Sequence, residues 1–119
     1  MARHKLDNYL RTHRKRTCLS QREVAFLLGR ENEMTVSRYE RAVQRPSLET
    51  LLAYRVIFGA PLEELFAGVF QKVERSVRKR ARSLITRLEK GEANRRTTRK
   101  LDVARRIDNE PAPELAEAA

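Results

Sequence analysis

The sequence predicts an all-α protein: five short helices, then a long amphipathic helix and a short basic helix. Apolar residues recur three and four positions apart along most of the chain, and stretches that alternate apolar with polar residues are few. Glycine, proline and N-capping residues separate these stretches at helix-length intervals. With 119 residues, of which 40% are hydrophobic and 35% charged, the chain can form one small core and an extension.

The first helix is expected at about residues 5–16, where Leu6 and Leu10 share one face. Ser20 and Glu23 have the spacing of a capping box, in which each residue's side chain bonds the backbone N–H of the other. This spacing predicts that a second helix begins directly after Ser20.

Gly29 suits the end of the second helix, because glycine readily adopts the positive φ found there. Val36 and Tyr39 lie three residues apart on a third, short helix at about 33–41, and both are expected in the core. Ser47 is a good N-cap for a fourth helix. That helix is expected to end before the next glycine, after which a proline opens a fifth, short helix.

From residue 69 onward, six apolar residues follow a heptad-like spacing of three and four. They are Phe70, Val73, Val77, Ala81, Leu84 and Leu88. We predict a helix over 69–90 with this stripe as a dimerisation seam. The alternatives are a helix that folds back on its own domain and a solvated single helix. A short amphipathic helix in a very basic setting follows, with Leu101, Ala104 and Ile107 on its apolar face.

Charge divides the chain into three parts. Residues 1–68 carry 12 basic and 8 acidic side chains, and residues 69–109 carry 14 and 5. Residues 110–119 have three glutamates, two prolines and no basic residue. We therefore expect an N-terminal domain, a basic helical extension and a disordered acidic tail. Within the extension, residues 94–100 could form a basic arm that becomes ordered on binding.

A net charge of +10 and a pI near 10.6 favour an acidic partner, above all nucleic acid. One cysteine and two histidines exclude an intramolecular disulfide and predict no metal site and no cofactor. The longest apolar run is too short for a membrane span, and no signal peptide is evident, so we expect a cytoplasmic protein. No phosphate-binding loop, carboxylate pair or nucleophile–base arrangement is visible, so we do not expect an enzyme.

Three segments together resemble the lambda repressor/Cro-type (xenobiotic-response-element-like) helix-turn-helix DNA-binding family over residues about 6–67. These are Leu19-Ser-Gln with Ala25 and Gly29, then Thr35-Val-Ser-Arg-Tyr-Glu-Arg41, then Pro46-Ser-Leu with Pro61-Leu-Glu-Glu-Leu-Phe66. The resemblance implies a five-helix domain, residues 1–68, that inserts its third helix into the major groove of duplex DNA.

By this resemblance a set of side chains contacts DNA: Gln21, Asn32, Glu33, Thr35, Ser37, Arg38, Arg41, Gln44 and Arg45. Ser37 and Arg38 would read bases, Arg38 by a bidentate contact to guanine. The last three would contact the phosphate backbone. Arg14 and Glu40 occupy positions that are usually paired, which implies a structural ion pair between the first and third helices.

The chain departs from the family pattern at several positions. Five residues, 30–34, separate Gly29 from Thr35 where four are usual. Cys18 and Ala42 stand where glycine is frequent. Phe26 and Leu27 are apolar where polar residues are usual, and could receive the 69–90 helix of the same chain or of a partner.

The function expected is that of a sequence-specific transcriptional regulator, a repressor, bound as a homodimer to a near-palindromic operator. Two alternatives remain open. One is an antitoxin-like module that binds a protein partner through residues 69–109 and DNA through its head. The other is a non-specific nucleic-acid binder.

Overall fold

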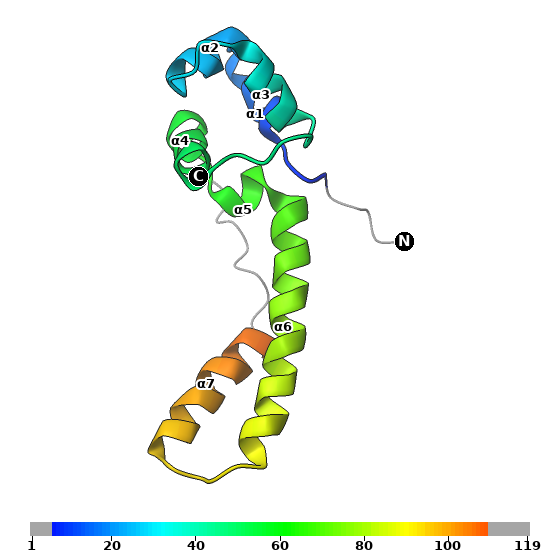
Figure 1. Cartoon of the computed structure of the whole chain (residues 1–119), viewed down its shortest axis with the longest axis vertical. Helices are drawn as coiled ribbons and strands as arrows, with labels where there is room; N and C mark the ends of the chain where they lie inside the picture. The colour runs from blue at the N-terminus through cyan, green and yellow to red at the C-terminus, as the bar shows by residue number, and fades with distance from the viewer. Residues whose placement is uncertain (1–5, 110–119) are drawn as a thin grey trace. The chain divides into compact units, whose positions relative to one another are not determined.

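The structure, a computed structural model, describes residues 6–109. Helices joined by turns and loops make up this part, which contains no strand (Figure 1). Its helices are α1 (Leu10–Thr17), α2 (Gln21–Leu27), α3 (Glu33–Glu40), α4 (Leu48–Phe58), α5 (Leu62–Leu65), α6 (Ala67–Glu89) and α7 (Arg95–Asn109). The all-α class is confirmed, with five short helices before the long one. The expected disordered tail, 110–119, lies outside the described residues.

The chain divides into two compact units, residues 1–70 and residues 71–119. The boundary falls inside α6, two residues after the one expected from charge. None of the helices between residues 6 and 109 has both the length and the apolar character that crossing a membrane requires.

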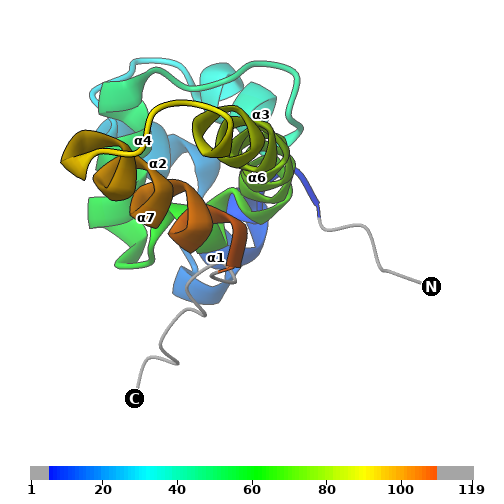
Figure 2. The same cartoon turned by 90° about the horizontal axis from the view of Figure 1, so that it is seen from below.

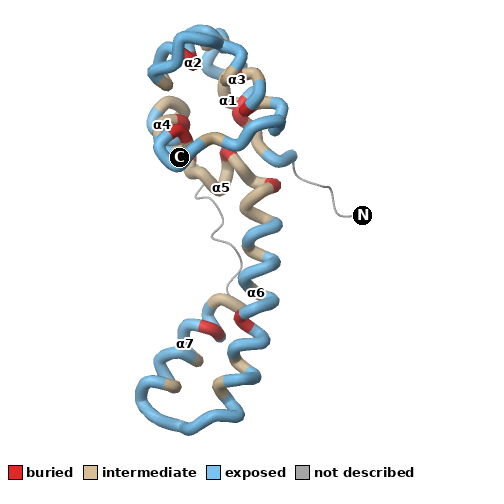
Figure 3. The backbone as a smooth tube through the Cα atoms, in the orientation of Figure 1, coloured by how far each residue is buried: buried red, intermediate tan, exposed pale blue. Residues whose placement is uncertain are grey.

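The core of the first unit gathers residues from all five short helices (Figure 3). Leu10, Val24, Val36 and Leu65 are fully buried, and Tyr54 is 1% exposed. Tyr54 packs edge-on against the ring of Tyr39 and stacks with Phe58. Burying these side chains is the main stabilising contribution in a unit of this size.

The first helix begins at Leu10, so the expectation of a helix from about residue 5 was wrong. Leu6 is 60% exposed and lies outside α1. The backbone of residues 6–9 instead bonds the end of α5 and the start of α6: Tyr9 N donates to Leu65 O at 2.7 Å, and Gly68 N donates to Leu6 O at 2.9 Å. These tertiary bonds replace the helical bonds that the Leu6–Leu10 spacing predicted.

The predicted helix ends of α2 and α4 are confirmed. Ser20 Oγ accepts from Glu23 N at 3.0 Å, and Ser20 N donates back to Glu23 Oε1 at 2.9 Å. The N–H bond from Ser20 holds the pKa of the Glu23 carboxyl below its usual range. Ser47 caps α4, and Gly59 ends it with a φ of 64°.

In the second unit, α6 and α7 form a helical hairpin (Figures 1 and 2). Arg82 Nε contacts Asp108 Oδ1 at 2.6 Å, and Arg105 Nη2 contacts Glu89 Oε2 at 3.5 Å. Ala81 on α6 and Ala104 on α7 are the buried residues among those described in this unit.

Two expectations about the second unit change. Residues 95–100 are the first turns of α7, not an unstructured arm, because Asn94 Oδ1 accepts from Thr97 N at 2.9 Å and caps the helix. Ala81, placed in a seam between chains, is covered within its own unit. Of the other seam residues, Val73, Val77 and Leu84 are exposed, while Phe70 and Leu88 are half-buried.

Candidate nucleic-acid interface

Helices α2 and α3 pack closely against each other. Val24 and Ala25 of α2 and Val36 and Tyr39 of α3 are all buried on their facing sides. Ala25 is 2% exposed, and its small side chain allows the two short helices to approach closely.

The turn between them accommodates the extra residue without disturbing either helix. Gly29 adopts a φ of 74°, and Arg30 N donates to Ala25 O at 2.8 Å. Asn32, expected to reach DNA, is the N-cap of α3: its Oδ1 accepts from Met34 N at 2.8 Å. The predicted start of α3 at residue 33 is therefore confirmed.

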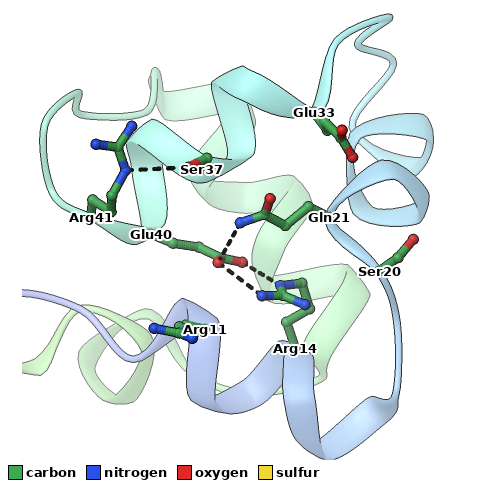
Figure 4. A pocket seen from close by; sticks show the side chains of 8 residues that line it. All are labelled: Arg11, Arg14, Ser20, Gln21, Glu33, Ser37, Glu40 and Arg41. Atoms are coloured by element: carbon green, nitrogen blue, oxygen red, sulfur yellow. Dashed lines mark hydrogen bonds and ion pairs between the residues drawn. The ribbon is translucent and has the colours of Figure 1, made fainter.

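A polar groove lies where α1, α2 and α3 meet (Figure 4). It is lined by Arg11, Arg14, Ser20, Gln21, Glu33, Ser37, Glu40 and Arg41. Basic side chains of α1 and of the C-terminal end of α3 thus border the groove, and an anionic ligand can approach between these two helices.

At the floor of this groove, Arg14 and Glu40 form a bidentate ion pair (Figure 4). Arg14 Nε lies 2.5 Å from Glu40 Oε2, and Nη2 lies 3.1 Å from Oε1. The two side chains are 13% and 4% exposed. The bond to Glu40 raises the pKa of the Arg14 guanidinium, which stays charged at any physiological pH.

Two further bonds join this pair to α2 and to the segment just before it. Gln21 Nε2 donates to Glu40 Oε1 at 3.1 Å, and Arg14 Nη1 donates to Leu19 O at 3.2 Å. The Glu40 carboxylate of α3 therefore accepts hydrogen bonds from side chains of both α1 and α2. These bonds fix the positions of the three helices relative to one another. One N–H of the Gln21 amide is engaged inward, which leaves its second N–H and its amide oxygen for the ligand predicted at this position.

The outer side of α3 and the following turn carry most of the predicted DNA contacts. Glu33, Arg38 and Arg41 are exposed, whereas Thr35 and Ser37 are half-buried. Arg41 Nε donates to Ser37 Oγ at 3.2 Å, which orients the guanidinium along the groove (Figure 4).

The groove brings together Gln21, Glu33, Ser37 and Arg41 from the predicted set. The other members lie outside it: Asn32, Thr35, Arg38, Gln44 and Arg45. Of these, Gln44 and Arg45 are exposed in the turn after α3.

The sequence reasoning missed Arg11 and Ser20 as groove residues. Arg11 could have been found from its spacing, because it lies three residues before Arg14 on the same helix and so shares its face. For Ser20 the sequence indicates only a capping role.

Comparison with known proteins agrees with this geometry. The helix-turn-helix family model matches residues 10–65 of the chain. No curated protein and no solved structure matches the chain significantly. The matched segment runs from the first residue of α1 to the last residue of α5, so it covers the helices that build the groove. Residues 10–65 are a DNA-binding helix-turn-helix domain of the lambda repressor/Cro type.

Proposed function

We propose that this protein is a sequence-specific transcriptional regulator that inserts α3 into the major groove of duplex DNA. The observation that carries this proposal is the division of α3 into two faces. Val36 and Tyr39 are buried, while Arg38 and Arg41 lie exposed on the opposite side. A helix held by one face, with polar groups on the other, is what groove recognition requires.

On this proposal each group of side chains has its own task. Arg38 donates two hydrogen bonds to O6 and N7 of a guanine, and this bidentate contact discriminates against other bases by about 1–3 kcal/mol. Ser37, Thr35, Glu33 and Asn32 face the neighbouring base pairs or phosphates. Gln21, Arg41, Gln44 and Arg45 contact the backbone and set the register of the domain.

We further propose that the protein acts as a homodimer and as a repressor on a near-palindromic operator. Support for a dimer comes from α6, where Val73, Val77 and Leu84 are 53%, 43% and 40% exposed beside the buried Ala81. A symmetric dimer presents two α3 helices to half-sites one or more turns of DNA apart, about 34 Å per turn. Repression by occupying DNA needs no catalytic group, and we propose no enzymatic activity.

Selection of duplexes from a random pool, followed by sequencing, tests this function. We expect an enriched near-palindrome whose half-sites have a fixed spacing. Arg38→Ala should relax the preference at one base pair of each half-site, whereas Arg45→Ala should weaken binding to all sequences alike. A pool that shows no enrichment above the input would contradict sequence-specific regulation and favour non-specific binding.

A protein-binding role for the first unit is a second candidate, supported by an apolar hollow on α2. Phe26 is 79% and Leu27 52% exposed, and both line this hollow with Leu19. A single monomeric chain rarely leaves side chains of this size together in water without a use. Co-purification of a stoichiometric second protein, lost in Phe26→Glu/Leu27→Glu, would favour this protein-binding role of the first unit.

A further inference from the structure

The second unit carries far more positive charge than its own packing uses. Residues 71–109 contain 14 basic and 5 acidic side chains. Three of the carboxylates are occupied by ion pairs inside this unit: Glu74 with Arg78, Asp108 with Arg82, and Glu89 with Arg105. Most of the cationic side chains therefore take no part in these three ion pairs.

A set of exposed basic side chains has no ion pair with any described residue. Its members are Arg75, Lys79, Arg80, Arg87, Lys90, Arg95, Arg96, Arg99 and Lys100. They lie on both helices of the hairpin, and they are densest where α7 begins.

Three of them, Arg95, Arg96 and Arg99, form what we call the arginine cluster. Together with Asn94 they line a shallow hollow on the first turns of α7. Lys90 lies at the other end of the short connection that joins α6 to α7 (Figure 1).

The arginine cluster opposes the folding of the helix that carries it. The first turn of α7 contains no acidic residue, although acids stabilise the positive end of a helix dipole and bases destabilise it. Arg95 and Arg99 are also like charges four residues apart, as are Arg96 and Lys100, which costs further stability. An anionic ligand reverses both effects, because it neutralises the guanidinium groups and faces the free N–H groups of the helix end.

We propose that the arginine cluster binds the phosphate backbone of duplex DNA and is a second contact surface in addition to α3. This inference rests on the proposed DNA-binding function of the first unit. Duplex is favoured over single-stranded nucleic acid because residues 71–109 contain no Phe, Tyr or Trp on which unpaired bases could stack. The unit can therefore bind phosphates but offers no aromatic platform for bases.

Contacts of this kind add affinity without sequence preference. Both surfaces belong to one chain, so engagement of α3 raises the effective concentration of the arginine cluster at the same DNA molecule. The expected signature is a steeper dependence of affinity on salt than α3 and its flanking turn produce by themselves.

The test compares two double variants of the full chain. Arg95→Gln/Arg99→Gln removes two charges from the arginine cluster. Arg16→Gln/Arg55→Gln removes two exposed charges from α1 and α4 of the first unit, outside the groove. Both variants lower the net charge equally, so a general charge effect would act on both alike.

Affinity is measured for the selected duplex and for a random duplex over a series of salt concentrations. For the cluster variant we expect the slope of log K against log salt to fall by about two, and affinity to fall at least about tenfold near 0.1 M salt, on both duplexes. The control variant should stay within about twofold of the parent protein. Circular dichroism should show unchanged or increased helix stability in the cluster variant, because the opposing charges are gone.

Equal slopes and affinities for the two double variants would overturn the proposal. Loss of binding to duplex RNA with unchanged binding to duplex DNA would also overturn it, and would assign the cluster to RNA. Failure of the proposed function shows differently, as a parent protein that binds selected and random duplexes equally. In that case the comparison on random duplex alone still decides whether the arginine cluster binds DNA.

Discussion

Two residues of the helix-turn-helix domain adopt a positive φ without being glycine. Ala42, directly after the C-cap of α3, has a φ of 58°, and Cys18, the C-cap of α1, has a φ of 64°. A side chain in this left-handed region costs about 1–2 kcal/mol, which glycine avoids. These are the positions at which the sequence departs from the glycines of the family pattern.

Replacing Ala42 by glycine should therefore stabilise the domain. We expect Ala42→Gly to raise the free energy of unfolding by about 0.5–1 kcal/mol after the larger unfolded-state entropy of glycine is subtracted. Ala53→Gly, inside α4, is the matched control and should destabilise by about 1 kcal/mol. Urea unfolding measures both, and a less stable Ala42→Gly variant would contradict the strain argument.

The Arg14–Glu40 ion pair stabilises the groove because both charges are largely removed from water. In Glu40→Gln the guanidinium of Arg14 loses its counter-charge while it stays 13% exposed. We expect the free energy of unfolding to fall by about 3 kcal/mol. Glu31→Gln, at an exposed carboxylate in the α2–α3 turn, should change it by less than about 0.5 kcal/mol. A near-equal stability of the two variants would show that the pair is energetically neutral.

Tyr54 buries a hydroxyl group that has no hydrogen-bond partner among the described residues. Desolvation, with the nearby charge of Glu40, raises the pKa of this hydroxyl above its usual value. The pKa of this hydroxyl is higher in the folded than in the unfolded protein. Its titration therefore does not lower the free energy of unfolding below about pH 10, and lowers it progressively as the pH rises above that value.

Tyr54→Phe removes this unpaired hydroxyl and should leave the domain equally or up to about 1 kcal/mol more stable at pH 7. It should also lessen the loss of stability on raising the pH above about 10. Tyr9→Phe is the control, because its hydroxyl accepts from Leu6 N at 3.3 Å. Melting temperatures at pH 7 and at about pH 10.5 measure both effects. Marked destabilisation of Tyr54→Phe at pH 7 would show that the hydroxyl does have a hydrogen-bond partner.

At the scale of elements, the start of α6 depends on a close backbone contact. A Cβ at Gly68 would lie 2.2 Å from Leu6 O and 2.9 Å from Asp7 Cα, and both are backbone atoms that cannot rotate away. The segment 6–9 therefore packs against α6 only when position 68 has no side chain.

Gly68→Ala should destabilise the first unit by about 1–3 kcal/mol, because segment 6–9 must move outward and lose its bonds to α5 and α6. Gly91→Ala, in the connection between α6 and α7, is the control. Its Cβ would meet nothing closer than Leu88 O at 3.6 Å, so stability should change little. Amide hydrogen exchange at Tyr9 and Gly68 should accelerate in the first variant alone; unchanged exchange there would contradict the contact.

At the scale of the whole molecule, the proposed dimer would depend on apolar residues of α6 that stay exposed, among them Val73 and Leu84. Charging two of them in Val73→Asp/Leu84→Asp should convert the proposed dimer into a monomer at micromolar concentration. The fold should persist, because neither side chain is buried. Val56→Asp, at an 82% exposed valine of α4, should leave the mass unchanged. Light scattering gives the mass, and a monomeric parent protein would refute the dimer.

Local patterns in the sequence predicted much of the fold. The Ser20–Glu23 spacing, Ser47, Gly29 and Gly59 placed the ends of α2 and α4 correctly, because caps and left-handed stops act within a single turn of the chain. The family resemblance placed Arg14 opposite Glu40, where the structure has a bidentate bond.

Local patterns in the sequence did not predict the interactions between segments that are distant along the chain. The Leu6–Leu10 spacing is helical, yet backbone bonds from residues 6–9 to Leu65 and Gly68 overrode it. The basic run before Leu101 reads as an unstructured arm, yet it forms the first turns of α7, which Asn94 caps and whose later turns are paired with α6.

The sequence by itself determined the all-α class, the caps at the ends of α2 and α4, and the family pattern of the first unit. Caps depend on residues within a turn of each other, and the family pattern depends on residue types at fixed positions along one segment. Only the tertiary structure decided that Gln21 bonds Glu40, that Arg11 borders the groove and that Ala81 is covered by its own chain. Those outcomes depend on which surfaces meet. The free energy of burying and pairing these side chains depends on residues far apart in the sequence, so no single segment predicts it.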